Sequence, residues 1–108
     1  MLKAAFYQVV QCQESPEEIR AEMQEFAADV GLGFHAFYTD SPKPWYLSKP
    51  SSVFRKMVED ASERKFDILI IERMSDFMNC CMDAQKVLRA MKKQGVRIFY
   101  WNEHVLEL

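Results

Sequence analysis

Side chains able to act as nucleophiles occur in two short segments of this 108-residue chain. Cys12 and Ser15 belong to the first segment, and the adjacent thiols Cys80 and Cys81 belong to the second. A thiol beside a helix start has a lowered pKa, and such a thiolate can attack an electrophile. Three cysteines without a Cys-x-x-Cys spacing are nevertheless more typical of free cysteines that pack as small apolar residues. The adjacent pair also cannot form an unstrained disulfide.

Metal and nucleotide chemistry find little support in the sequence. His35 and His104 are the only two histidines, and neither belongs to a spacing typical of metal ligands. No glycine occurs between Gln11 and Ser15, so this turn cannot bring backbone N–H groups against a phosphate as a nucleotide-binding loop does. We therefore expect no metal and no cofactor.

Binding chemistry is concentrated in residues 41–58, which hold four cations, three aromatic side chains and no acidic residue. Cations of this kind meet phosphates, and aromatic rings stack on bases or on partner side chains. The alternative is a solvated loop whose aromatic rings fold back onto the domain. The predicted binding residues are Lys43, Trp45, Tyr46, Lys49, Arg55 and Lys56.

Composition limits the partners. Fourteen basic and sixteen acidic residues give a net charge of −2, so the chain lacks the basic excess that attracts nucleic acid or anionic membrane without specificity. No apolar run approaches the roughly 18 residues of a membrane helix, and no signal peptide precedes the first apolar run. We expect a cytoplasmic protein with no membrane contact.

Strand and helix patterns alternate along the chain and must position these residues. Apolar runs predict strands at 4–10, 32–38, 66–71 and 96–101. Caps and three- to four-residue apolar spacing predict helices near 16–30, 52–65 and 82–94. This order indicates a single α/β domain over 1–108, with a three-layer, mainly parallel four- to five-stranded sheet and helices on both faces. The end of the chain, from Val105, is either a helix turn or an edge strand.

Several of these segments together resemble the amino-terminal catalytic domain of the serine recombinases, the resolvase and invertase family. The matching residues, which run over nearly the whole chain, are Phe6 to Cys12, Met23, Phe26-Ala27, Gly31, Tyr38-Thr39-Asp40, Lys49-Pro50, Phe54 to Ala61, Lys65 to Ile71, Asp83-Ala84, Leu88, Gly95-Val96 and Glu103. The resemblance implies a resolvase-like fold and a role in DNA recombination.

The same resemblance implies that the chemistry has been lost. In the family a serine attacks a DNA phosphodiester, and arginines neutralise the transferring phosphoryl group. Here Gln11 stands at the serine position and Val9 at the adjoining arginine position. Asp76 and Asn79 stand where the resemblance implies the arginines that follow the third strand. This pattern predicts a pseudoenzyme that binds DNA weakly, an active recombinase, or a second copy of itself as a homodimer.

The sequence leaves two other functions open. The first is a receiver-like signalling domain, in which Glu72 would stand at the position of the phosphoryl-accepting aspartate. The second is an active site-specific recombinase that uses Cys12 or Ser15 as its nucleophile. That enzyme would need nearby cations, and Lys43, Lys49 and Arg73 are the candidates.

Overall fold

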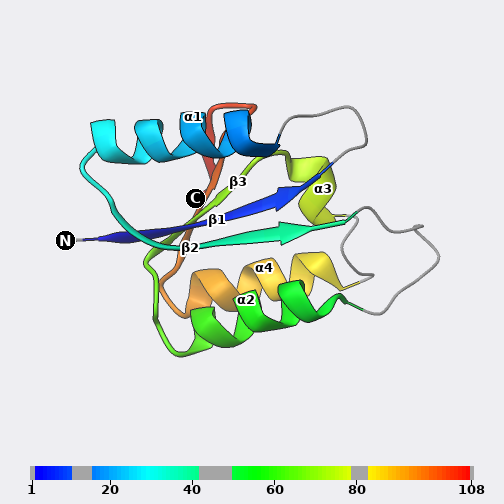
Figure 1. The fold of residues 1–108 in the computed structure, drawn as a ribbon. Coiled ribbons are helices and arrows are strands. Elements are labelled where there is room, and N and C mark those ends of the chain that lie inside the picture. The colour runs from blue at the N-terminus through cyan, green and yellow to red at the C-terminus, as the bar shows by residue number, and fades with distance from the viewer. Residues whose placement is uncertain (1, 11–15, 42–49, 79–82, 108) are drawn as a thin grey trace.

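The structure is a computed structural model that describes residues 2–10, 16–41, 50–78 and 83–107, and Figure 1 traces the rest in grey. Its centre is a five-stranded sheet in the order β2-β1-β3-β4-β5. The first four strands are parallel, and β5 is antiparallel to β4. The strand bounds are β1 Lys3–Val9, β2 Gly33–Asp40, β3 Ile68–Ile71, β4 Arg97–Tyr100 and β5 Val105–Glu107.

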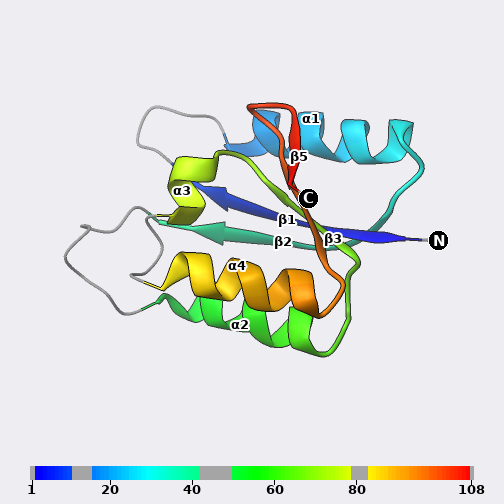
Figure 2. The ribbon, with the colours of Figure 1, turned by 180° about the vertical axis from the view of Figure 1, so that it is seen from behind.

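Helices cover both faces of this sheet. Helix α1, Pro16–Asp29, lies on one face, and α2, Ser52–Ser62, lies beside α4, Ala84–Lys93, on the other (Figures 1 and 2). The short helix α3, Met74–Met78, follows β3 at the carboxyl end of the sheet. Because the crossovers place helices on both faces, β1 and β3 are buried on both sides, which explains their continuous apolar runs.

Alternation along β1 divides the core between the two faces. Ala5, Tyr7 and Val9 belong to the apolar cluster beneath α2 and α4. Ala4 and Phe6 belong to the smaller cluster beneath α1. Since successive side chains of a strand point to opposite faces, Gln8 must follow Phe6 onto the α1 face.

The predicted α/β fold class and the three helices are confirmed. Two details differ from the sequence analysis, and a third decides between its two alternatives for the end of the chain. Helix α3 was not predicted, because five residues are too few to show helical periodicity. The end of the chain forms the edge strand β5, one of its two predicted alternatives. Strand β2 runs to Asp40, beyond the predicted end at residue 38, because the Val10 N–H donates to the Asp40 carbonyl at 3.0 Å and extends the pairing with β1.

Candidate functional site

Asp40 joins three elements at the carboxyl edge of the sheet. It is the last residue of β2, and its Oδ2 accepts hydrogen bonds from the Tyr7 hydroxyl of β1 at 3.0 Å and from the Ser51 hydroxyl at 2.5 Å. Its Oδ1 accepts from the Ser41 N–H at 2.9 Å. Ser51 is the N-cap of α2, and its Oγ accepts from the Phe54 N–H at 3.0 Å. This carboxylate therefore fixes the positions at which the chain leaves β2 and enters α2.

Gln8 lies near the same edge, on the α1 side of β1, and is paired in register with Thr39 of β2. Its side chain is buried at 1% exposure, and neither Oε1 nor Nε2 forms a hydrogen bond with a residue in the described part of the chain. A buried amide without partners costs about 1–3 kcal/mol of stability. Its neighbour Thr39 accepts a hydrogen bond from Arg20 of α1 at 2.8 Å.

Glu72 follows β3 directly and is 2% exposed. Its Oε1 lies 3.6 Å from an Nη atom of Arg73. A phosphoryl-accepting carboxylate must be reached by its donor, and this side chain is closed off from solvent. The geometry therefore does not favour the receiver-like alternative.

Asp60 of α2 is the centre of a second polar cluster, between α2 and β2. It is 3% exposed, and its Oδ2 accepts a hydrogen bond of 2.5 Å from the Tyr38 hydroxyl. Lys56 and Lys65 place their ammonium groups 3.2 and 3.5 Å from Oδ1. His35 Nε2 lies 3.7 Å from Oδ2. The cluster fastens α2 to the sheet with an ionic and hydrogen-bonded contact.

These contacts shift two pKa values in opposite directions. Burial acts to raise the pKa of Asp60, but the Tyr38 hydroxyl and the Lys56 ammonium together lower it below its usual value. Burial, followed by the Asp60 carboxylate, raises the pKa of Tyr38. Near neutral pH the pair is therefore a carboxylate accepting from a neutral phenol.

Few of the predicted site residues lie within the described part of the structure. Val9 does, and it is 7% exposed in the core beneath α2 and α4. Arg55 and Lys56 lie exposed on α2. The backbone of Asp76 belongs to α3, while its side chain falls outside the described structure. The remaining positions, Gln11, Lys43, Trp45, Tyr46, Lys49 and Asn79, also lie outside the described residues, as do all three cysteines.

Comparison with solved structures decides the fold. The chain aligns with a resolvase family site-specific recombinase from Streptococcus pneumoniae at a TM-score of 0.80 and 20% identity, covering 99% of this chain and 76% of that one. The N-terminal catalytic domain of TP901-1 integrase gives 0.73 and 17%, covering 96% and 80%. The fold is that of a serine-recombinase catalytic domain. The catalytic domain of ISC1926 TnpA, an IS607-like serine recombinase, gives 0.68 and 15%, covering 93% and 70%.

No family model and no curated protein matches the chain. The similarity to the serine recombinases is therefore one of fold. Sequence reasoning found the fold but missed the polar groups that the fold brings together. Asp40 and Gln8 entered the sequence analysis only within segments that match the family, without the contacts that the structure gives them. In the described ranges, no cluster of three or more histidine, cysteine or acidic side chains is arranged to hold a metal ion. Helices of the described segments are all too short or too polar to cross a membrane.

Proposed function

We propose that this chain is a non-catalytic serine-recombinase-like domain that acts in DNA recombination by binding a partner. The partner is an active recombinase or, more weakly, recombination-site DNA, and the domain works in the cytoplasm. The observation that carries the proposal is the burial of Val9. The position at which the resemblance implies a phosphate-binding arginine instead holds a core side chain that packs beneath α2 and α4.

The charges at the carboxyl edge support the same proposal. Glu72 places a carboxylate at the end of β3, and a phosphodiester approaching this edge would be repelled by it. The Ser51 hydroxyl already donates to Asp40 and caps α2, so it is held in a structural role. An arrangement of this kind serves better to hold loops in place than to stabilise phosphoryl transfer.

The proposed interaction surface is the segment between Asp40 and Ser51 together with the start of α2. Loops at the carboxyl ends of parallel strands are where α/β domains place their contacts. Lys43, Lys49 and Trp45 supply charge and a large amphipathic ring within this segment. Arg55 and Lys56 extend the positive charge onto the exposed side of α2.

A DNA assay tests the loss of chemistry. The purified chain is incubated with DNA carrying recombination sites, with and without an active serine recombinase, and analysed on denaturing gels. We expect no cleavage and no covalent protein–DNA product from this chain. An adduct that disappears in Cys12→Ala or Ser15→Ala would overturn the proposal and favour an active recombinase with an unusual nucleophile.

A binding assay tests the surface. We expect Trp45→Ala to weaken binding to the recombinase by about 2 kcal/mol, roughly 30-fold in Kd, with a small effect on stability. Lys93→Ala, at an exposed position of α4, is the control and should bind as the wild type does. Binding to DNA should decrease as salt rises, whereas binding to an apolar protein surface should not.

A further inference from the structure

Strand β2 is one edge of the sheet, and no strand of the described residues pairs with its outer side. It is eight residues long and contains no proline and no lysine. Proteins usually guard such an edge with charges, proline, a bulge or a short strand, because its free backbone groups can pair with another chain. The one irregularity in the β1–β2 register lies between Ala4 and Ala5, towards the amino end of the strand.

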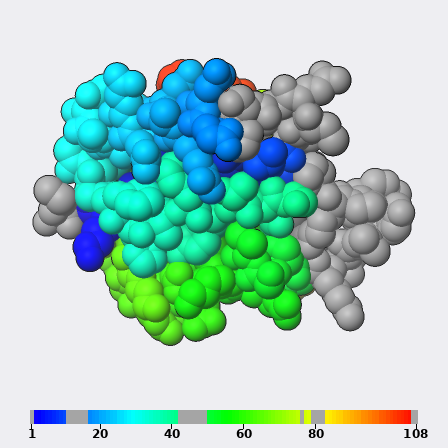
Figure 3. All heavy atoms as spheres, viewed as in Figure 1, coloured from blue at the N-terminus to red at the C-terminus, as the bar shows by residue number. Residues whose placement is uncertain are grey.

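The register identifies which backbone groups of β2 are free. The Asp40 carbonyl accepts from the Val10 N–H, so the backbone of Asp40 faces β1. Alternation turns Tyr38 towards β1 as well, and turns the N–H and C=O groups of Phe37 and Thr39 outward. Within the described segments, no backbone group bonds to this outer side. In the space-filling view, β2 is open to solvent between α1 and α2 (Figure 3).

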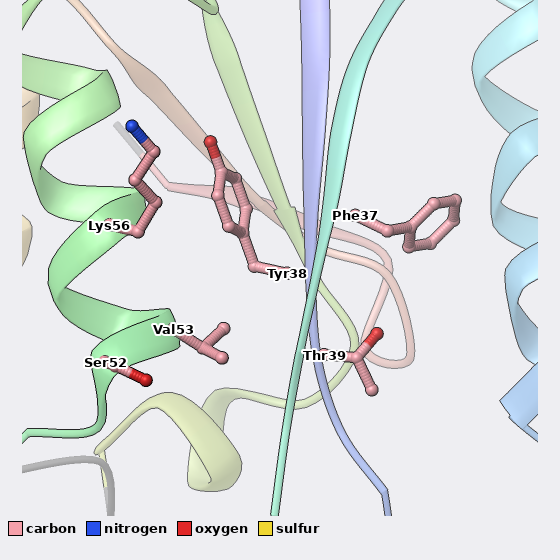
Figure 4. A pocket seen from close by; sticks show the side chains of 6 residues that line it. All are labelled: Phe37, Tyr38, Thr39, Ser52, Val53 and Lys56. Carbon is pink, nitrogen blue, oxygen red and sulfur yellow. The ribbon is translucent and has the colours of Figure 1, made fainter.

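A groove of about 400 Å³ lies along this part of the edge. Its lining residues come from β2 and the first turns of α2: Phe37, Tyr38, Thr39, Ser52, Val53 and Lys56. Figure 4 shows Tyr38 pointing towards α2, and Phe37 and Thr39 pointing to the opposite side of the strand. A strand added here would send alternate side chains to these two sides.

Lys56 is the cation among the described residues that line the groove, none of which is acidic, and Arg20 lies on the other side of β2 against Phe37 and Thr39. On the α2 side, Lys56 is half-exposed and pairs with Asp60 and Glu59. On the α1 side, Arg20 is exposed, bonds to the neutral Thr39 hydroxyl and stacks over Phe37 at 5.1 Å. Arg20 forms no ion pair with a carboxylate in the described ranges, so its charge is available to a partner.

We propose that the outer edge of β2 binds an extended acidic segment of a partner protein as an added strand. Main-chain hydrogen bonds to Phe37 and Thr39 would supply affinity, and acidic side chains facing Arg20 and Lys56 would supply specificity. This inference rests on the proposed function, because it takes the partner to be a protein. A second copy of this chain fits less well, since pairing two β2 edges would bring two Arg20 and two Lys56 side chains into one interface.

The test uses a labelled peptide that alternates valine with glutamate, followed by fluorescence anisotropy and by amide hydrogen exchange. We expect binding to the wild type and slowed exchange of the Phe37 and Thr39 amides. Thr39→Pro removes an outward N–H that β1 does not use, as edge strands tolerate, and should weaken binding about ten-fold. Thr39→Val loses the Arg20 hydrogen bond but keeps the N–H, and should bind nearly as well as the wild type.

Charge is tested with two arginine variants and a second peptide. Arg20→Gln should weaken binding about five-fold, whereas Arg89→Gln, at an exposed position of α4, should leave binding unchanged. A peptide with lysine in place of glutamate should not bind. The exchange measurement is made on the wild type, so it tests the edge even if Thr39→Pro fails to fold.

Three results would overturn the inference. The first is unchanged exchange at Phe37 and Thr39, and the second is equal binding of the lysine peptide. The third is concentration-dependent dimerisation of the wild type that Thr39→Pro abolishes, because the edge would then serve a second copy. If the chain binds no peptide and forms no DNA adduct, this inference fails and the proposed function stands. A DNA adduct would instead overturn the proposed function.

Discussion

Asp60 and Gln8 are both buried polar side chains beside the sheet, but they differ in their polar partners. Asp60 faces a phenol, two ammonium groups and an imidazole. Gln8 lies on the other face of the sheet, where its amide has no hydrogen-bond partner in the described part of the chain. Burial alone therefore does not tell whether a polar side chain stabilises a fold. Its hydrogen-bond and ionic partners decide whether its contribution to stability is favourable or unfavourable.

The largest effect is expected at Asp60. Asp60→Ala leaves the buried Tyr38 hydroxyl without its acceptor and leaves the Lys56 and Lys65 ammonium groups with only the exposed Glu59 and Glu63, so we expect the free energy of unfolding to decrease by about 3 kcal/mol. Urea denaturation measures it. Glu59→Ala removes the exposed partner of Lys56 and serves as the control, with a loss below about 1 kcal/mol. Equal losses in the two variants would contradict the comparison.

Acid should weaken the same cluster. The folded pKa of Asp60 lies below its unfolded value of 3.8, so its contribution is fully present above that value and is lost as pH falls through the folded pKa. Asp67 also has a lowered pKa, caused first by the Lys3 N–H, and adds to the slope. We expect Asp60→Asn to show a shallower decrease of melting temperature between pH 5 and pH 2, by about the contribution of one carboxylate. An unchanged slope would place the acid sensitivity elsewhere.

Ser51 should show an intermediate effect, since its contacts are half-buried. Ser51→Ala removes both the cap of α2 and one of the two hydroxyl donors to Asp40, so we expect a loss of about 1–2 kcal/mol in the free energy of unfolding. Ser52→Ala, one residue further along and exposed, is the matched control. The prediction is wrong if the two serine variants have the same melting temperature.

The smallest change, and the only stabilising one, is expected at Gln8. Gln8→Leu replaces a buried amide that has no hydrogen-bond partner among the described residues with an apolar side chain of similar size, so we expect a gain of about 1 kcal/mol. Gln8→Glu places a charge at the same position and should destabilise the fold. Thermal melts of both variants test this. A destabilised Gln8→Leu would mean that the amide does have a partner.

The sequence predicted the layers and the helices because those follow from local patterns. A serine cap at residue 51 or 52 and apolar residues at three- to four-residue spacing predicted the helix that the structure forms as α2, with Ser51 as its N-cap. The recombinase fold was also predicted, from the order and spacing of the matching residues, and the chain aligns with solved recombinase catalytic domains at 20% identity or below. The end of β2 was placed two residues early, because Thr39 and Asp40 are typical turn residues that pairing with β1 holds in a strand.

The polar contacts of the candidate site could not be predicted in the same way. Tyr7 and Asp40 are separated by 33 residues and Tyr38 and Asp60 by 22, so only the folded sheet brings each pair together. No local period or motif marks a contact of this range. That no described residue bonds to the Gln8 amide is harder still to foresee, because it depends on every neighbour of the α1 face.

The hydrogen bond between Ser51 and Asp40 has a consequence for protein engineering. It closes the base of the segment that links β2 to α2, so the two attachment points keep their separation whatever sequence joins them. The entropy of closing a loop rises slowly, by about 0.6 kcal/mol for each doubling of its length. Foreign peptides grafted between residues 41 and 50 should therefore be displayed from a rigid frame, making this domain a small scaffold for loop libraries.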